Sequence, residues 1–287
     1  MKKTLVLLLA LFALMVACDN NDDDVIRTSD LNLNLSGLEP LGVDYVYEGW
    51  IIVGGSPVST GTFTSVNFPQ VFTVNRNDLE NATAFVLSIE PAVDPDPAPA
   101  PTKVLSGNFT GNSAAVSAEI VGDFSNAAGS FFLRTPTDET ETNNGNDQYG
   151  VWFGVPGMPP RPDFVLPILP DGWAYEGWVV GDSGPISTGT FTQFGVRDSG
   201  NQFSGTQNNA GPPVPGEDFF LNAPIGEVFP LDVRGRTVVI SVEPVPDDSP
   251  APFAIKPLVA TAGQAIAPSI HSFVQNLGSL PTGTVTR

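Results

Sequence analysis

The chain has 287 residues and a formal net charge of -19, from 31 acidic and 12 basic side chains. Apolar residues make up 41% of it, enough for a buried core, which argues against a disordered chain. The negative charge argues against nucleic acid as a partner, because phosphate binding needs clusters of Lys and Arg. One Cys and one His cannot form a disulfide or a zinc or iron–sulfur cage, so we expect no metal and no cofactor.

The first 17 residues have the pattern of a secretory signal. Two lysines precede an apolar run from Thr4 to Ala17, which is shorter than the roughly 20 residues that a membrane-spanning helix needs. Small residues end the run directly before Cys18, as in the lipobox of bacterial lipoproteins. We predict a signal peptide over 1–17 and a lipid on Cys18 that anchors the protein to the bacterial outer membrane. An ordinary signal peptide followed by a spare thiol is the alternative.

An acidic segment follows Cys18. Residues 19–24 read DNNDDD, and like charges repel and keep such a run extended. We therefore expect residues 18–30 to be an acidic tether. Acidic runs directly after an acylated Cys resemble the surface-export signal of some bacterial lipoproteins, which would place the protein on the cell surface. A plain solvated spacer, which leaves it on the periplasmic face, is the alternative.

The rest of the chain holds two copies of one unit. The segment YEGWIIVGGSPVSTGTFT from Tyr47 and the segment YEGWVVGDSGPISTGTFT from Tyr175 agree at 11 of 18 positions, at an offset of 128 residues. A second block, VLSIEP from Val86, matches VISVEP from Val239 at an offset of 153. The difference in offset means that the second copy carries about 25 additional residues between its two blocks.

The apolar residues alternate as they do in strands. Leu31, Leu33 and Leu35 are separated by Asn, and short β-rich runs end at Glu-Pro, where Pro removes a ladder donor. Clusters of Gly, Pro, Asn and Asp separate these runs. The pattern predicts an all-β protein made of two tandem antiparallel β-sandwich modules of the immunoglobulin-like kind.

The composition also suggests where the modules begin and end. We expect the first module over 31–155, closed by a hairpin of residues 130–134 and 149–154. A Pro-rich connector is expected over 156–165, because the run PGMPPRP favours a stiff, extended chain. The second module is expected over 166–287, with a longer inserted loop.

Both copies carry a strand of the form Tyr-Glu-x-Trp and a later strand that ends in Ser-Ile/Val-Glu-Pro. This pattern resembles the C-terminal extracytoplasmic domain of anti-sigma-K factors. The residues that carry the resemblance are Tyr47, Glu48, Trp50 and Glu90 in the first copy, and Tyr175, Glu176, Trp178 and Glu243 in the second.

The resemblance implies a β-sandwich outside the cytoplasmic membrane, joined through a membrane helix to a cytoplasmic domain that holds a sigma factor. This sequence has no spanning helix after the signal and no His/Cys zinc signature of the usual sigma-binding module. It therefore carries over the fold and a sensory or binding role, and not the sequestration of a sigma factor. Fold similarity by itself is weak support for a function.

We expect the repeated carboxylates to be structural and the protein not to be an enzyme. Glu48 and Glu176 each lie two residues before a Trp, where an acid or base with a raised pKa is conceivable, but no second catalytic group stands at a fixed spacing from them. Glu90 and Glu243 precede Pro at strand ends, where a carboxylate caps a turn. No residue is predicted to be catalytic.

Three further features carry weaker alternatives. Asp94 and Asp247 lie in matched Pro-rich turns, but calcium takes six to eight oxygen ligands, so ordinary acidic turns are favoured. Trp152 and Trp173 are the freer candidates for stacking against a sugar ring. The inserted segment from Gln193 to Arg236 is a long loop, and long loops often carry ligand contacts.

Together these features predict a non-enzymatic cell-envelope lipoprotein. It is anchored through Cys18 and presents two anti-sigma-K-like β modules that bind or sense a protein or glycan partner. The main alternative is an accessory sensor that regulates an extracytoplasmic-function sigma factor pathway. A calcium-dependent adhesin and a hydrolase of envelope polymers are the less favoured alternatives.

Overall fold

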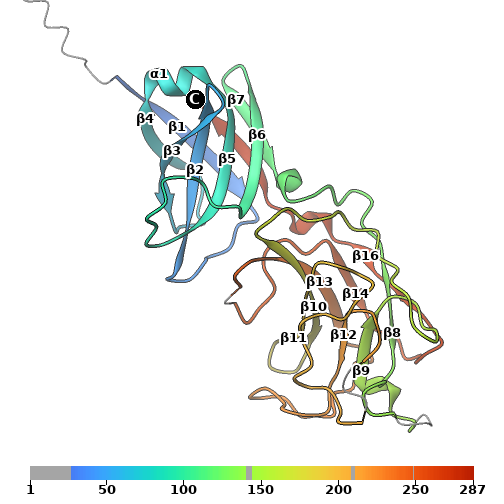
Figure 1. The fold of residues 1–287 in the computed structure, drawn as a ribbon. Coiled ribbons are helices and arrows are strands. Elements are labelled where there is room, and N and C mark those ends of the chain that lie inside the picture. Colours follow the sequence, from blue (N-terminus) through green and yellow to red (C-terminus); the bar gives the residue numbers. More distant parts are fainter. Residues whose placement is uncertain (1–26, 140–143, 208–210, 248) are drawn as a thin grey trace, which may run out of the picture.

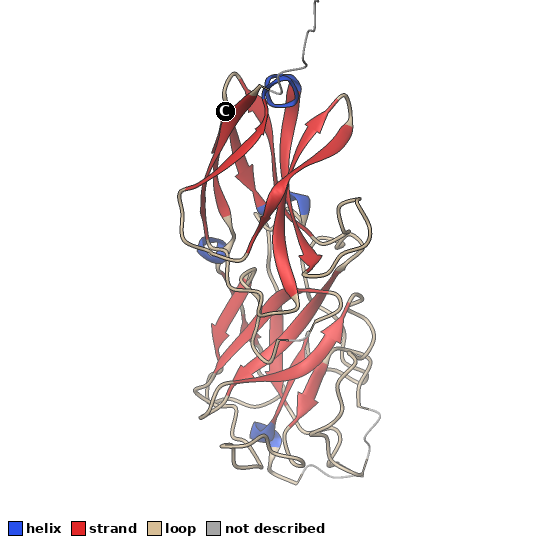
Figure 2. Cartoon of the chain, turned by 90° about the vertical axis from the view of Figure 1, so that its left-hand side faces the viewer, coloured by secondary structure: helices blue, strands red, loops and turns tan. Residues whose placement is uncertain are grey.

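The computed structural model describes residues 27–139, 144–207, 211–247 and 249–287. In this part the protein is almost entirely antiparallel β and forms two modules stacked end to end (Figures 1 and 2), which confirms the predicted all-β class. The predicted signal peptide, the lipidated Cys18 and most of the acidic tether lie outside the described residues. None of the helices in the described part is long and apolar enough to cross a membrane.

The first module is a single eight-stranded sheet in the order β3-β2-β5-β6-β7-β17-β1-β4. Its strands are β1 (Thr28–Ser36), β2 (Tyr45–Val53), β3 (Ser56–Phe63), β4 (Gln70–Asn75), β5 (Ala82–Pro91), β6 (Lys103–Thr110), β7 (Ser113–Ser117) and β17 (Thr282–Thr286). Its two edge strands approach each other, and the ring centroids of Phe63 in β3 and Phe72 in β4 lie 5.7 Å apart. The module is therefore nearly a barrel, and not the two-sheet sandwich that was predicted, because β17 and β1 join its two halves.

Alternation of apolar and polar residues explains how this sheet encloses its core. Leu31, Leu33 and Leu35 of β1 are buried, and the residues between them are exposed. One short helix, α1 (Arg76–Asn81), lies between β4 and β5, and the side chain of Asn75 caps it by accepting from two backbone N–H groups. Single 3-10 turns follow β7, precede β9 and precede β17, at Ala118–Ile120, Asp147–Tyr149 and Leu277–Ser279.

The second module has two sheets that face each other. The five-stranded sheet is β11-β10-β13-β14-β16 and the four-stranded sheet is β12-β9-β8-β15. The strands are β8 (Ser130–Leu133), β9 (Gly150–Phe153), β10 (Trp173–Val180), β11 (Pro185–Phe191), β12 (Gly216–Asp218), β13 (Thr237–Pro244), β14 (Leu258–Thr261), β15 (His271–Ser272) and β16 (Val274–Gln275). Aromatic rings fill the space between the sheets. A Cβ at Gly177 of β10 would lie 2.2 Å from the Phe153 ring of β9, so this close approach requires Gly.

The module boundaries differ from those expected from the sequence. Strand β17 follows the whole second module, yet it returns to the first module and pairs with β1 and β7. In Figure 1 the chain end marked C accordingly lies beside α1 and β7. The second module is therefore inserted between β7 and β17 of the first.

Two other segments also belong to the second module. The β8–β9 hairpin, expected at the end of the first module, pairs with β12 and β15. Residues 156–165, expected to connect the modules, pack within the second one through backbone bonds between Val155 and Arg161 and between Ala128 and Val165. Local strand signals do not reveal these partners, because the pairing strands lie far apart in the sequence.

The two sequence copies share their strand register. Tyr47 pairs with Phe63, and Tyr175 pairs with Phe191, at the offset of 128 residues. The β2–β3 and β10–β11 ladders share a bulge at the same place, where Thr60 of β3 and Thr188 of β11 are the additional, unpaired residues. The additional residues of the second copy lie between β11 and β13 and contribute β12 to the facing sheet.

Candidate functional site

A pocket of about 640 Å³ lies where the two modules meet. The first module contributes the loop before β2 and the turn between β5 and β6, and the second contributes the turn after β13. Its walls are mainly apolar and rich in proline. The apolar side chains that line it include Pro40, Leu41, Val43, Tyr45, Ile89, Pro91, Pro101, Pro244, Pro246, Pro250 and Phe253. Pockets of this size and character are typical of ligand sites.

The charged residues that line this pocket are all acidic. Glu39, Asp44, Glu243 and Asp247 line it, and no Lys or Arg is among the described lining residues. Burial raises the pKa of Glu39, although the charge of Lys256 nearby acts in the opposite direction. The pocket therefore combines an apolar surface with acidic groups, which become fully charged as the pH rises above neutral.

The Trp, Ser and Glu of the repeated motif form a buried chain of hydrogen bonds in the first module. Nε1 of Trp50 donates to Oγ of Ser88 at 2.8 Å, and Ser88 donates to Oε1 of Glu90. The backbone N–H of Ala100, ten residues further along, donates to the same carboxylate oxygen at 2.8 Å. Since Ala100 lines the pocket, Glu90 holds the pocket-lining turn in place.

The same chain of bonds recurs in the second module. Nε1 of Trp178 donates to Oγ of Ser241 at 2.7 Å, and Ser241 donates to Glu243. The backbone N–H of Phe253, also ten residues on, donates to both oxygens of Glu243 at 3.0 Å. The Glu-Pro pairs therefore fasten the turns on both sides of the pocket.

The Tyr residues of the motif fasten the preceding loops. The hydroxyl of Tyr47 donates to the carbonyl of Glu39 at 2.8 Å, which holds the first-module loop that lines the pocket. The hydroxyl of Tyr175 donates to the carbonyl of Pro167 at 2.6 Å. In both cases the acceptor lies eight residues before the Tyr. Both Tyr side chains are buried, and burial raises the pKa of each hydroxyl well above its usual range.

Three carboxylates of the second module come together beside the pocket. Glu176 in β10, Glu243 in β13 and Asp247 in the following turn each offer an oxygen, and these oxygens lie within 4.8 Å of one another. Burial raises the pKa of Glu176 to about 7, and the charge of Asp247 adds to this shift. Burial also raises the pKa of Glu243 to about 8, and repulsion from Glu176 and Asp247 contributes. Such a group can hold a shared proton or a cation.

The corresponding residues of the first module form a looser group. Burial raises the pKa of Glu90, and the charges of Glu48 and Asp94 contribute. However, Glu48 is half-buried and Asp94 is exposed, whereas Glu176 is 5% exposed. A Ser hydroxyl donates to each strand carboxylate, from Ser59 to Glu48 and likewise in the second copy.

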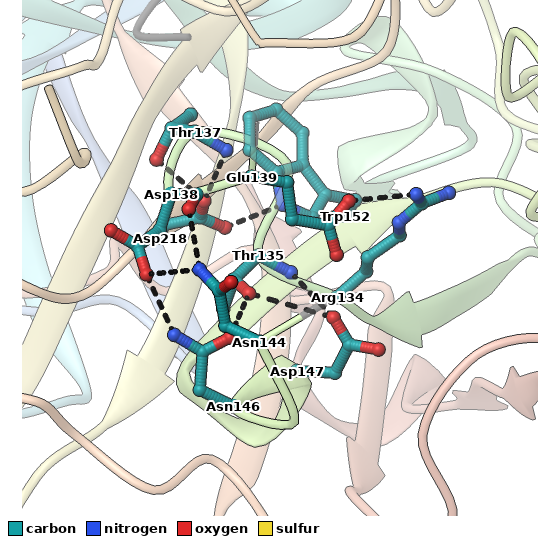
Figure 3. A network of polar contacts seen from close by, with 10 residues as sticks. All are labelled: Arg134, Thr135, Thr137, Asp138, Glu139, Asn144, Asn146, Asp147, Trp152 and Asp218. Carbon is teal, nitrogen blue, oxygen red and sulfur yellow. Dashed lines mark hydrogen bonds and ion pairs between the residues drawn. The ribbon is translucent and has the colours of Figure 1, made fainter. Parts of the chain in front are cut away.

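A separate polar network closes the far end of the second module (Figure 3). Asp218 is fully buried and accepts hydrogen bonds from Nε1 of Trp152 and from the N–H and hydroxyl of Thr137. Its neighbour Glu217 accepts from Ser204, and burial raises the pKa of Glu217 to about 7. This network ties the inserted segment to the β8–β9 loop.

Several residues singled out in the sequence take other places. Trp152 and Trp173 are 1% and 3% exposed, so neither offers a face to a sugar ring, and this expectation was wrong. The one His of the chain, His271, stacks on the ring of Phe131 with centroids 5.1 Å apart. None of the described residues of the inserted segment lines the pocket; its β12 instead extends the facing sheet.

Sequence reasoning missed the pocket and the grouping of the three carboxylates. The pocket needs the relative placement of two modules, for which the sequence holds no local signal. The alignment of the copies did contain one useful hint, because Ser88 and Ser241 occupy matched positions two residues before the Glu of the motif. A Ser repeated between apolar strand residues indicates a buried hydrogen bond.

Comparison with known proteins gives one match. The family model described as Anti-sigma-K factor rskA, C-terminal, matches residues 19–105, which are 87 of the 287 residues. This match extends over β1 to β5 and into β6 of the first module. Neither a curated protein nor a solved structure matches the chain. The C-terminal domain of anti-sigma-K factors is extracytoplasmic, and part of the first module is therefore similar to an anti-sigma factor-related extracytoplasmic domain.

Proposed function

We propose that the protein is a non-enzymatic cell-envelope lipoprotein that binds a cationic, apolar segment of a protein partner in the pocket between its modules. The observation that carries this proposal is the pocket itself, which both modules line and which combines apolar walls with four carboxylates. An apolar segment gains free energy by burying surface on the prolines and on Phe253. A Lys or Arg in that segment would offset the charge of the surrounding acids.

Other features support the envelope location and the two-module reading. The pattern before Cys18 favours a lipid anchor, and the family match favours an extracytoplasmic domain. Recurrence of the Trp-Ser-Glu chain, of the bulge and of the Tyr–carbonyl bond supports a second anti-sigma-K-like unit in the second module. The repeated motif then serves to shape the loops at the junction.

Binding can be tested with synthetic peptides on the full mature chain. Fluorescence anisotropy would compare a labelled peptide of alternating Pro, Leu and Lys with the same peptide carrying Glu in place of Lys. Val43 lines the pocket and is 88% exposed, so Val43→Arg adds a positive charge to the pocket without disturbing the core. Val71→Arg is the matched control, because Val71 is 57% exposed on β4 and does not line the pocket.

We expect the Lys peptide to bind, with affinity about tenfold weaker in Val43→Arg and unchanged in Val71→Arg, since one like-charge contact costs on the order of 1.4 kcal/mol. Equal binding of the Lys and Glu peptides, or equal effects of the two variants, would contradict the proposal.

The family match also favours a second function, an accessory sensor for an extracytoplasmic-function sigma pathway. In that case the cationic segment belongs to a membrane-bound regulator. Cross-linking in intact cells should then recover an anti-sigma membrane protein with the native chain and lose it with Val43→Arg. Protease treatment of intact cells, with the native chain and with a variant that carries Asn at residues 22–24, reports which face of the membrane holds the modules.

A further inference from the structure

The carboxylates of Glu176, Glu243 and Asp247 form a compact group that the repeated motif only partly explains. Glu176 projects from β10, Glu243 from the neighbouring strand β13, and Asp247 from the turn that follows it. One oxygen of each lies within 4.8 Å of one oxygen of each of the others. In the part of the chain that the structure describes, it is the one group of three acidic, His or Cys side chains that is this compact.

A second, independent observation concerns Glu176 alone. Its side chain is only 5% exposed, and Ser187 donates to its Oε1. Oε2 of Glu176 is buried and receives no hydrogen bond from a hydroxyl, an amide or a basic side chain, and the side chain that contacts the Glu176 carboxyl is Asp247, a second acid. A buried carboxylate oxygen without a donor is costly, and native proteins rarely leave one. Because the Glu176 carboxylate faces Asp247 and Glu243, either a proton or a cation must lie between these acids, and at alkaline pH the proton is lost.

Basic side chains do not pair with the two glutamates of the group. The three ion pairs among the described residues involve Glu139, Asp232 and Asp182, so neither Glu176 nor Glu243 is paired with Lys or Arg. The serine hydroxyls and the Phe253 N–H that contact the group orient its carboxylates. Hydrogen bonds of this kind fix carboxylate ligands around metal ions.

We infer that Glu176, Glu243 and Asp247 bind one hard divalent cation, such as Ca²⁺, Mg²⁺ or Mn²⁺, in the wall of the pocket. Carboxylate oxygens are the ligands that these cations prefer, and the absence of His and Cys from the group disfavours zinc and copper. Glu243 and Asp247 line the pocket, so a cation and its remaining water ligands have access from solvent. The inference does not depend on the proposed peptide ligand.

The first module provides a matched control. Glu48 occupies the position of Glu176 at the offset of 128 residues and accepts from Ser59 as Glu176 accepts from Ser187. Glu48, however, is half-buried and is not part of a compact group. Glu48→Gln therefore removes an equivalent charge from an equivalent strand without touching the cation site.

The experiment measures thermal unfolding of the mature chain at mildly alkaline pH in EDTA and then in excess CaCl₂, MgCl₂ or MnCl₂. When the cation concentration is about a hundredfold above the dissociation constant, binding to the folded state alone should raise Tm by about 5–10 °C for a protein of this size. We expect this rise in the native protein and in Glu48→Gln, and its loss in Glu176→Gln. Calorimetric titration with the same cation should give one site per chain.

The stability of Glu176→Gln in EDTA shows whether this variant folds. The substitution is nearly isosteric and removes repulsion within the group, so in EDTA this variant should be at least as stable as the native protein. Asp247→Asn, at a partly exposed position, is the second variant and should weaken the cation effect as well. The inference is overturned if none of the three cations changes Tm or releases heat on titration. It is also overturned if the cation effect persists in both variants, which would place the cation elsewhere on this acidic chain.

Discussion

Strand β17 gives the sharpest test of the fold, because it makes the first module depend on residues that follow the second. Each of its five residues pairs with β1 on one side and with β7 on the other. Val285 points into the core and is 0% exposed. Loss of β17 opens the sheet between β1 and β7 and exposes both strands.

The cost of the perturbation can be worked out for two variants. Val285→Ala removes two buried carbons, worth about 0.8 kcal/mol each, and the cavity raises the total to about 2–3 kcal/mol. Deletion of residues 282–287 removes ten strand pairings, and at about 1 kcal/mol per hydrogen bond this is comparable with the whole stability of a domain. The deletion should therefore unfold the first module.

Hydrogen exchange followed by mass spectrometry can locate the effect. After the deletion, peptides from β1 and β7 should lose their protection, whereas peptides from β13 should keep it. Val274→Ala in β16 is the control for the point variant, because Val274 is 68% exposed and its truncation should change stability by less than about 0.5 kcal/mol. Continued protection of β1 and β7 in the deleted protein would refute the assignment of β17 to the first module.

Three further predictions concern polar side chains. Ser241→Ala leaves the Trp178 N–H without its acceptor and should cost about 1–3 kcal/mol in urea unfolding; no change would mean that water replaces the hydroxyl. The unfolded chain releases the Glu217 proton near pH 4.5 and the folded protein near 7, so stability should fall by about 3 kcal/mol as pH rises across this range. Glu217→Gln should remove that part of the pH dependence, and an unchanged profile would contradict it. Arg287 donates to three backbone carbonyls and lies over the Phe109 ring. Arg287→Ala should therefore lower the free energy of unfolding in urea by about 2 kcal/mol. An unchanged urea midpoint would mean that these contacts do not stabilise the protein.

The candidate site illustrates which relations a sequence can reveal. Pairs of residues in the same short segment were visible, such as the Glu-Pro that ends a strand or the Glu two residues before a Trp. Asp247 was also noted, as an acidic turn residue. Its approach to Glu176 was not foreseeable, because the two lie 71 positions apart in the sequence and meet only through the pairing of β10 with β13.

The sequence by itself determined the all-β class, many of the strands and the matched blocks of the two copies. It did so because these are local properties: alternation places Leu31, Leu33 and Leu35 on one face, and the copies match residue by residue over short segments. Only the tertiary structure decided which strands pair. The return of β17 to the first sheet, the transfer of the β8–β9 hairpin to the second module and the pocket between the modules all follow from burying apolar faces and closing sheet edges. Those free energies depend on surfaces brought together from distant parts of the chain.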